Sequence, residues 1–182
     1  HFDKWAKEKT QKVTVVDDGT SSNETRLGAV KDIQFAIDAL GIDDEMLVIA
    51  GDNLLDFSLT EFVKYAQNKK ASCIMRYFEP SEERLHKCGV VKIDENDKIL
   101  DMEEKPANPK SHYAITGLYF YPKGVASMAE AVKPSARGEL EITTLNDMYL
   151  QQGNLDVQLM GRGFAWLDTG TMDSLIDAAN FV

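Results

Sequence analysis

The sequence predicts an α/β fold with a mixed, mainly parallel sheet flanked by helices. In the first half of the chain, short apolar runs alternate with segments whose apolar residues recur at helical spacing, which is the βαβ pattern of a parallel sheet. The second half adds further strand-like runs and a hairpin pattern, which predict antiparallel additions. A chain of 182 residues with 43% apolar and 27% charged residues is long enough for a proper core. We therefore expect residues 1–182 to form a single domain.

The first predicted elements are a strand, a helix and a second strand. Residues 12–16 (KVTVV) have the composition of a short buried strand, and a polar loop rich in turn-forming residues follows them. From Leu27 to Leu40 the apolar residues fall on one helical face, and Gly41 is suited to end that helix. Residues 46–50 (MLVIA) form a continuous apolar run, which is typical of a strand covered on both faces.

A second helix and a third strand complete the first half. Ser58 and Glu61 have the spacing of a capping box in front of an apolar helical stripe. Lys69 and Lys70 follow that stripe, close to the negative end of the helix dipole. Residues 72–78 (SCIMRYF) predict the next strand.

The second half of the chain is richer in strands. Residues 88–106 contain two apolar stretches around a polar run from Asp94 to Asp97, which we interpret as a hairpin. Residues 112–122 are rich in aromatic and β-branched side chains and predict another strand. The remaining predicted elements are helices at Val125–Val132 and Ile142–Gln151, strands at 155–160 and 163–168, and a helix over 171–182 with Thr171 as its N-cap.

Charge and cysteine content narrow the class of partner. The formal net charge is -10, which argues against a nucleic-acid or anionic membrane surface. An acidic protein that binds a polyanionic small molecule needs local Lys or Arg and a divalent cation. Cys73 and Cys88 match no metal spacing and fit a reducing cytosol, so we expect a cytoplasmic protein. No run of residues has the length of a membrane span, and no signal peptide is visible.

Two aspartates follow predicted strands at positions where α/β sheets bind ligands. Asp52 comes shortly after the apolar run 46–50, and Asp168 ends the predicted strand 163–168. Ligands in open α/β sheets bind outside the carboxyl ends of the strands. Each aspartate alone is more typical of a turn or cap than of a ligand. If the two strands lie side by side, however, the two carboxylates converge and suit Mg²⁺ shared with phosphate groups.

Residues 103–106 (EEKP) and several glycines are further candidates for a site. The EEKP run is equally consistent with a solvated charged turn and with a binding site, in which a carboxylate accepts from hydroxyls beside an ammonium that binds phosphate. Gly28, Gly89 and Gly117 either let a ligand approach the backbone or serve packing. The three histidines fit neither a triad nor a metal spacing, and the sequence contains no G-x-S-x-G, H-E-x-x-H or P-loop motif.

Six motifs follow one another along the chain in a specific order. They are AGDN (50–53), CGVV (88–91), EEKP (103–106), YAITGLYFYP (113–122), RGELEITTLNDMYL (137–150) and GRGFAWLDTGTMDSL (161–175). Taken together, these motifs resemble the sugar nucleotidyltransferase family, and most of all its glucose-1-phosphate thymidylyltransferases. The resemblance covers essentially the whole chain and is strongest from Gly89 to Leu175. It implies a Rossmann-like fold of the nucleotide-diphospho-sugar transferase type.

The resemblance implies a reaction and a set of site residues. The family joins a nucleoside triphosphate, for which dTTP or UTP is expected here, to a sugar 1-phosphate and releases pyrophosphate. The implied catalytic residues are Asp52, Lys105 and Asp168, with the two aspartates holding Mg²⁺ and the lysine the sugar phosphate. The resemblance also implies substrate-binding residues. Glu104 would bind the sugar hydroxyls, and the backbones of Gly89 and Ile115, together with Asn53, would line the sugar pocket. Arg137 would contact an anionic group, and Gly28 would lie next to the base of the nucleotide. Relatives also suggest a homo-oligomer.

The chain departs from this family at its start. The glycine-rich G-x-G-T-R loop that cradles the triphosphate is absent, and the chain begins without Met at residues that have helical spacing (Phe2, Trp5). We therefore expect an N-terminally truncated sequence that lacks the first two strand–helix steps and is inactive alone. Residues 22–32 differ from the usual base-contacting segment, and Cys88 replaces an aromatic residue, so base and sugar stay open. The alternatives are a non-catalytic nucleotide-sugar sensor or regulatory subunit, and a glycosyltransferase.

Overall fold

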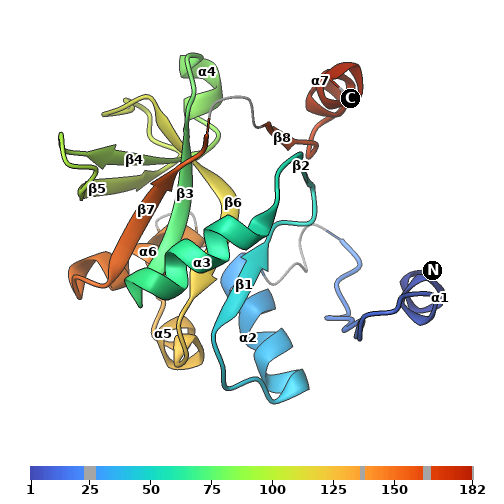
Figure 1. Cartoon of the computed structure of the whole chain (residues 1–182). Helices are drawn as coiled ribbons and strands as arrows, with labels where there is room; N and C mark the ends of the chain where they lie inside the picture. Colours follow the sequence, from blue (N-terminus) through green and yellow to red (C-terminus); the bar gives the residue numbers. More distant parts are fainter. Residues whose placement is uncertain (23–27, 136–137, 162–164, 182) are drawn as a thin grey trace.

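The computed structural model describes residues 1–22, 28–135, 138–161 and 165–181. Within these residues a six-stranded sheet forms the centre of the molecule, in the order β5-β4-β6-β3-β7, with β1 also paired to β6 (Figure 1). Its strands are β1 (Met46–Ile49), β3 (Ser72–Phe78), β4 (Gly89–Ile93), β5 (Ile99–Glu104), β6 (Tyr113–Tyr121) and β7 (Leu155–Leu159). The predicted hairpin is confirmed as β4–β5. The other predicted strands of the sheet also form at the expected places.

Strand β6 is the organising strand of this sheet. It pairs along its length with β3, while β1 pairs with residues 118–121 and β4 pairs at Ala114. The mixed α/β class is confirmed, but the expected predominance of parallel pairing is corrected: within the described strands, β3–β7 is the parallel pair and the others are antiparallel. The reason is that β6 lies between β1 and β3 and runs opposite to both. β1 and β3 still share one direction, as the βαβ pattern predicted.

Helices cover both faces of the sheet. Helices α2 (Ala29–Leu40), α5 (Val125–Glu130) and α6 (Ile142–Gln151) bury their apolar residues in one cluster with side chains from β3, β4, β5, β6 and β7. Helix α3 (Leu59–Lys69) packs Phe62 and Ala66 against the opposite face, beside Cys73 and Phe120. Alternate residues of β3 and β6 therefore enter different clusters, as the two-residue period of a strand requires.

The helix ends follow the signals in the sequence. The Ser58 hydroxyl accepts a hydrogen bond from the Thr60 amide at 3.3 Å, so Ser58 is the N-cap of α3, while Glu61 pairs with Lys64. Helix α2 ends at Gly41, whose φ of 61° is easily adopted by glycine. No helix in the described part of the chain combines the length and apolar character that crossing a membrane requires.

The predicted strand at residues 12–16 is wrong in this structure. These residues form no strand, and the side chains of Val13 and Val15 are 36% and 41% exposed. The β-branched composition favours an extended chain, but a strand also needs a neighbour with which to pair. The remaining elements are α1 (Phe2–Lys7), α4 (Glu82–Leu85), α7 (Met172–Phe181) and a separate two-stranded pair of β2 (Asn53–Leu55) with β8 (Trp166–Asp168).

Candidate functional site

The open end of the β4–β5 hairpin carries the EEKP residues. Gly89 lies opposite Glu104 in the strand register, and the Lys105 amide donates to the Cys88 carbonyl at 3.0 Å. Lys105 has a φ of 45°, an uncommon conformation for a residue with a side chain. The Pro106 carbonyl oxygen lies 2.8 Å from His86 Nδ1, which supports the turn from outside. The hairpin therefore presents a carboxylate and an ammonium side by side at its end.

Glu104 is held by a residue that the sequence analysis did not single out. The Thr143 hydroxyl, from the first turn of α6, donates to Glu104 Oε2. Gly89 lies against the same group: a Cβ atom added there would sit 3.2 Å from Thr143 Oγ1, 3.4 Å from Ile115 Cδ1 and 3.5 Å from Glu104 Oε2. The structure thus brings together Gly89, Glu104 and Ile115 as predicted neighbours, and adds Thr143. Thr143 lies within the quoted motif 137–150, but its partner is distant in sequence.

The segments that carry Asp52 and Asp168 lie side by side. Strands β2 and β8 pair antiparallel, with Asn53 opposite Asp168. The Thr169 amide and hydroxyl both donate to the Asp52 carbonyl, at 2.8 Å and 2.7 Å. The Asn53 amide group donates to Asp52 Oδ1 at 2.8 Å, so one oxygen of that carboxylate already has a partner. The strand before Asp52 is not the neighbour of β8, because β1 pairs with β6. Asp52 and Asp168 come close instead because β2, which follows Asp52, pairs with β8.

The structure does not describe the side chain of Asp168. Among the side chains that it does describe, no group of three or more His, Cys, Asp and Glu is arranged to hold a metal. Arg137, the predicted anion contact, lies outside the described residues.

Gly117 on β6 lies where the six-stranded sheet packs against the β2–β8 pair. A Cβ atom at this position would lie 2.7 Å from Ala50 Cβ and 3.2 Å from both Asn53 Nδ2 and Trp166 Cζ2. The Gly117 carbonyl also accepts from the Ala50 amide at 2.8 Å. The close approach at Gly117 is thus to protein and not to open space, which favours the packing reading of this glycine.

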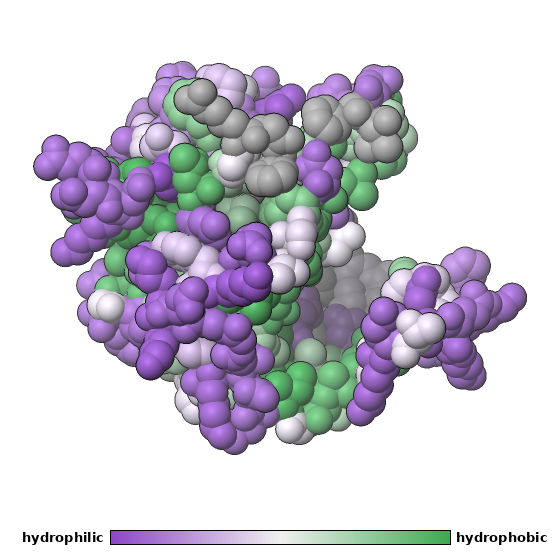
Figure 2. All heavy atoms as spheres, in the orientation of Figure 1, coloured by the Kyte–Doolittle hydropathy of each residue, from purple (hydrophilic) through white to green (hydrophobic). Residues whose placement is uncertain are grey.

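A cleft of about 1290 Å³ connects these pieces. It is lined by Gly28, Asp52, Glu104 and Lys105, together with residues of β1, α2 and the 138–142 segment. Figure 2 shows the surface hollowed between the main body and the N-terminal segment, but the residues that line this cleft all lie between Gly28 and Ile142. Burial raises the pKa of Asp32 on the cleft wall, and the nearby Asp18 carboxylate adds to that shift. Four predicted residues from three separate parts of the sequence therefore line one cavity.

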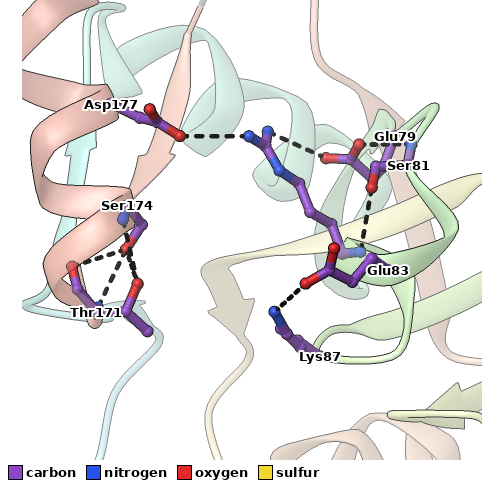
Figure 3. A network of polar contacts seen from close by, with 8 residues as sticks. Glu79, Ser81, Glu83, Lys87, Thr171, Ser174 and Asp177 are labelled. Atoms are coloured by element: carbon purple, nitrogen blue, oxygen red, sulfur yellow. Dashed lines mark hydrogen bonds and ion pairs between the residues drawn. The ribbon is translucent and has the colours of Figure 1, made fainter.

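Strand β8 continues into α7, which is attached to the rest of the molecule by polar contacts. Thr171 Oγ1 accepts from the Ser174 amide at 3.1 Å, which confirms Thr171 as the N-cap (Figure 3). The Arg84 guanidinium, on α4, lies 3.5 Å from Asp177 of α7 and 3.9 Å from Glu79. Because Arg84 and Asp177 are well exposed, this bridge contributes at most about 1 kcal/mol.

Comparison with known proteins defines the class to which this chain belongs. The profile of the Nucleotidyl transferase family matches residues 2–182, and the chain belongs to that family. Among characterised relatives, it is 47% identical over 142 residues to the glucose-1-phosphate thymidylyltransferase of Neisseria meningitidis, covering 77% of this chain and 48% of that protein. It is 50% identical over 137 residues to the enzyme of the same name from Neisseria gonorrhoeae, covering 74% and 46%. The chain thus spans about half the length of these relatives.

Solved structures agree with this assignment. A structure described as a glucose-1-phosphate thymidylyltransferase from Bacillus anthracis, in complex with sucrose, superposes with a TM-score of 0.74 at 37% identity, covering 85% of this chain and 60% of that one. A UDP-glucose pyrophosphorylase complexed with UDP-glucose gives a TM-score of 0.71 at 22% identity, covering 85% and 62%, and supports the fold alone. The predicted family resemblance is confirmed. Nucleotidyltransferases of this family generally use a divalent metal.

Proposed function

We propose that the protein carrying this chain transfers a nucleotidyl group from a nucleoside triphosphate to a sugar 1-phosphate. The products are an NDP-sugar and pyrophosphate. The observation that carries the proposal is the Glu104–Lys105 pair, which lines the same cleft as Asp52. A hydroxyl-binding carboxylate beside a phosphate-binding ammonium fits the two ends of a sugar 1-phosphate. The relatives named glucose-1-phosphate thymidylyltransferase support the same reading.

The chain's own residues act by positioning the substrates. A phosphate oxygen of the sugar 1-phosphate attacks the α-phosphorus in line, the bond to the β-phosphate oxygen breaks, and pyrophosphate leaves with that electron pair. Lys105 holds the attacking phosphate, and Glu104, fixed by Thr143, accepts hydrogen bonds from sugar hydroxyls. Gly89, Ile115 and Asn53 close the sugar pocket. Orientation of two bound polyanions supplies most of the catalysis expected for such a transfer.

We assign the remaining predicted residues to the nucleotide and the metal. Asp52 and Asp168 are the proposed Mg²⁺ ligands, since Asp52 is exposed and its backbone is bonded to the strand end that carries Asp168. Mg²⁺ bound there would neutralise charge on both polyanions. Gly28, which lines the cleft at the start of α2, is the proposed contact to the base of dTTP or UTP, and Arg137 a contact to phosphate.

A screen of pyrophosphate release tests the proposal. The protein that carries this chain would be incubated with Mg²⁺, each of four nucleoside triphosphates and a panel of sugar 1-phosphates. We expect release that requires both substrates, and none from residues 1–182 alone, because these residues contain no G-x-G-T-R sequence. Binding of NDP-sugars without release would favour the sensor function. Sugar transfer to an acceptor would favour a glycosyltransferase and overturn the proposal.

A further inference from the structure

Hydrogen bonds join the segments of the β2–β8 pair at both of its ends. At one end, Thr169 donates two hydrogen bonds to the Asp52 carbonyl. At the other end, beyond the pairing of Leu55 with Trp166, Asp56 Oδ1 accepts a hydrogen bond from the Ala165 amide at 2.6 Å. The two residues joined by this second contact are 109 positions apart in the sequence.

We propose that Asp56 is a positioning residue for the transfer reaction, acting through β8. Its bond to Ala165 fixes the register in which Asn53 lies opposite Asp168. A slip of one residue would turn every side chain of β8 to the other face of the pair, including that of Asp168. This inference rests on the proposed function, because it assigns Asp56 the task of keeping Asp168 beside Asp52.

The β2–β8 pair has few backbone hydrogen bonds of its own, so a contact at its end can fix its register. Each strand has only three residues, and the pair stands apart from the six-stranded sheet. Isolated two-stranded pairs are marginally stable in water. Leu54 is 46% exposed, and Trp166 supplies the apolar contact of the pair with the α3 face of the sheet.

Asp56 is too far along the strand to serve as a further metal ligand with Asp52. The three residues of β2 lie between the two, and four steps of extended chain correspond to about 13 Å. The carboxylate of Asp56 is bonded to the start of β8, whereas Asp168 is at its end. The role of Asp56 is therefore in geometry and not in coordination, and an uncharged acceptor should replace it.

The test compares Asp56→Asn, which keeps an acceptor oxygen, with Asp56→Ala, which does not. Asp94→Ala is the matched control, because Asp94 also accepts from backbone amides, those of Asn96 and Lys98 at 2.8 Å and 2.9 Å, but in the β4–β5 turn. Amide hydrogen exchange of residues 165–169 is measured for all variants. In parallel, the Mg²⁺ concentration giving half-maximal pyrophosphate release is measured in the protein that carries this chain.

We expect Asp56→Ala to accelerate exchange in β8 about tenfold or more and to raise the half-maximal Mg²⁺ concentration, at nearly unchanged thermal stability of the main sheet. Asp56→Asn should restore most of both effects, and Asp94→Ala should change neither. Unchanged exchange in Asp56→Ala, or an equal loss in Asp56→Asn, would overturn the proposal. Faster exchange with an unchanged Mg²⁺ requirement would reduce Asp56 to a structural contact. Absence of turnover in the wild type under every condition would instead count against the proposed function.

Discussion

Thr143→Val is the substitution that tests the sugar side of the site most directly. Valine has nearly the same shape as threonine, and Thr143 is 7% exposed, so the change removes a hydroxyl without opening a cavity. What is lost is the hydrogen bond to Glu104 Oε2. If Glu104 binds sugar hydroxyls, its carboxylate then loses one of the contacts that orient it, and the sugar 1-phosphate should bind less well.

The size of the effect follows from the surroundings of Glu104. Hydrogen bonds to charged groups contribute about 1.5–3 kcal/mol. The Glu104 side chain is 22% exposed, so water can replace part of the lost bond, and the lower end of that range applies. A loss of about 1.5 kcal/mol corresponds to roughly a tenfold weaker interaction. We therefore expect the KM for sugar 1-phosphate to rise about tenfold.

The assay is pyrophosphate release by the protein that carries this chain, with the two substrates varied separately. The KM for the nucleoside triphosphate should change less than twofold, because Thr143 acts through Glu104, which is assigned to the sugar. Thr144→Val is the control, since it makes the same change one residue further along α6. A sugar 1-phosphate KM within twofold of the wild type, or an equal effect of Thr144→Val, would refute the assignment of Glu104 to the sugar.

Three further substitutions extend these tests. Lys105→Met should raise the KM for sugar 1-phosphate at least tenfold, because it removes a phosphate-binding charge. Lys110→Met is the control: it removes the partner of Asp101 and Glu103 and should leave this KM unchanged. Equal effects of the two substitutions would remove Lys105 from the site. Gly117→Ala should destabilise the protein by about 1–3 kcal/mol in denaturant unfolding, because the new Cβ atom would lie 2.7 Å from Ala50 Cβ. Gly51→Ala should leave the stability nearly unchanged, because a Cβ atom at Gly51 would have no atom within 4 Å. Burial raises the pKa of Asp32 above its ordinary value, so the ionised carboxylate lowers the stability of the fold once the pH rises past that ordinary value. Asp32→Asn should therefore raise Tm at pH 7 and leave it unchanged at pH 3. The opposite pH dependence would contradict this.

Local signals in the sequence predicted most elements but not how they are arranged. Helix α6 begins and ends where its apolar spacing indicated, and the β4–β5 hairpin forms around its polar turn. Such features depend on residues within a few positions of one another. The position of β6 between β1 and β3 depends on contacts between residues that are 35 or more positions apart, and no local pattern records it. Residues 12–16 show the converse, because strand composition alone does not supply a partner.

The difference between local and long-range contacts also explains which site residues the sequence indicated. The EEKP and AGDN runs stand out because charged groups follow apolar strands directly, and the structure places both at the cleft. Thr143 and Asp56 look like ordinary helix and loop residues until their partners, 39 and 109 positions away, are known. Supporting residues of this kind carry no sequence signal of their own, since their role is set by the group they contact.

Strand β6 physically links the two halves of the candidate site. Ile115 and Gly117 are two residues apart on β6. Ile115 borders the space beside Gly89, where the hairpin presents Glu104, and Gly117 borders Asn53 and Trp166 of the β2–β8 pair. A shift of β6 therefore moves the sugar pocket and the proposed metal strands together. It follows that Gly117→Ala, although it lies outside the cleft lining, should raise both the KM for sugar 1-phosphate and the Mg²⁺ requirement, whereas Thr143→Val should raise only the former.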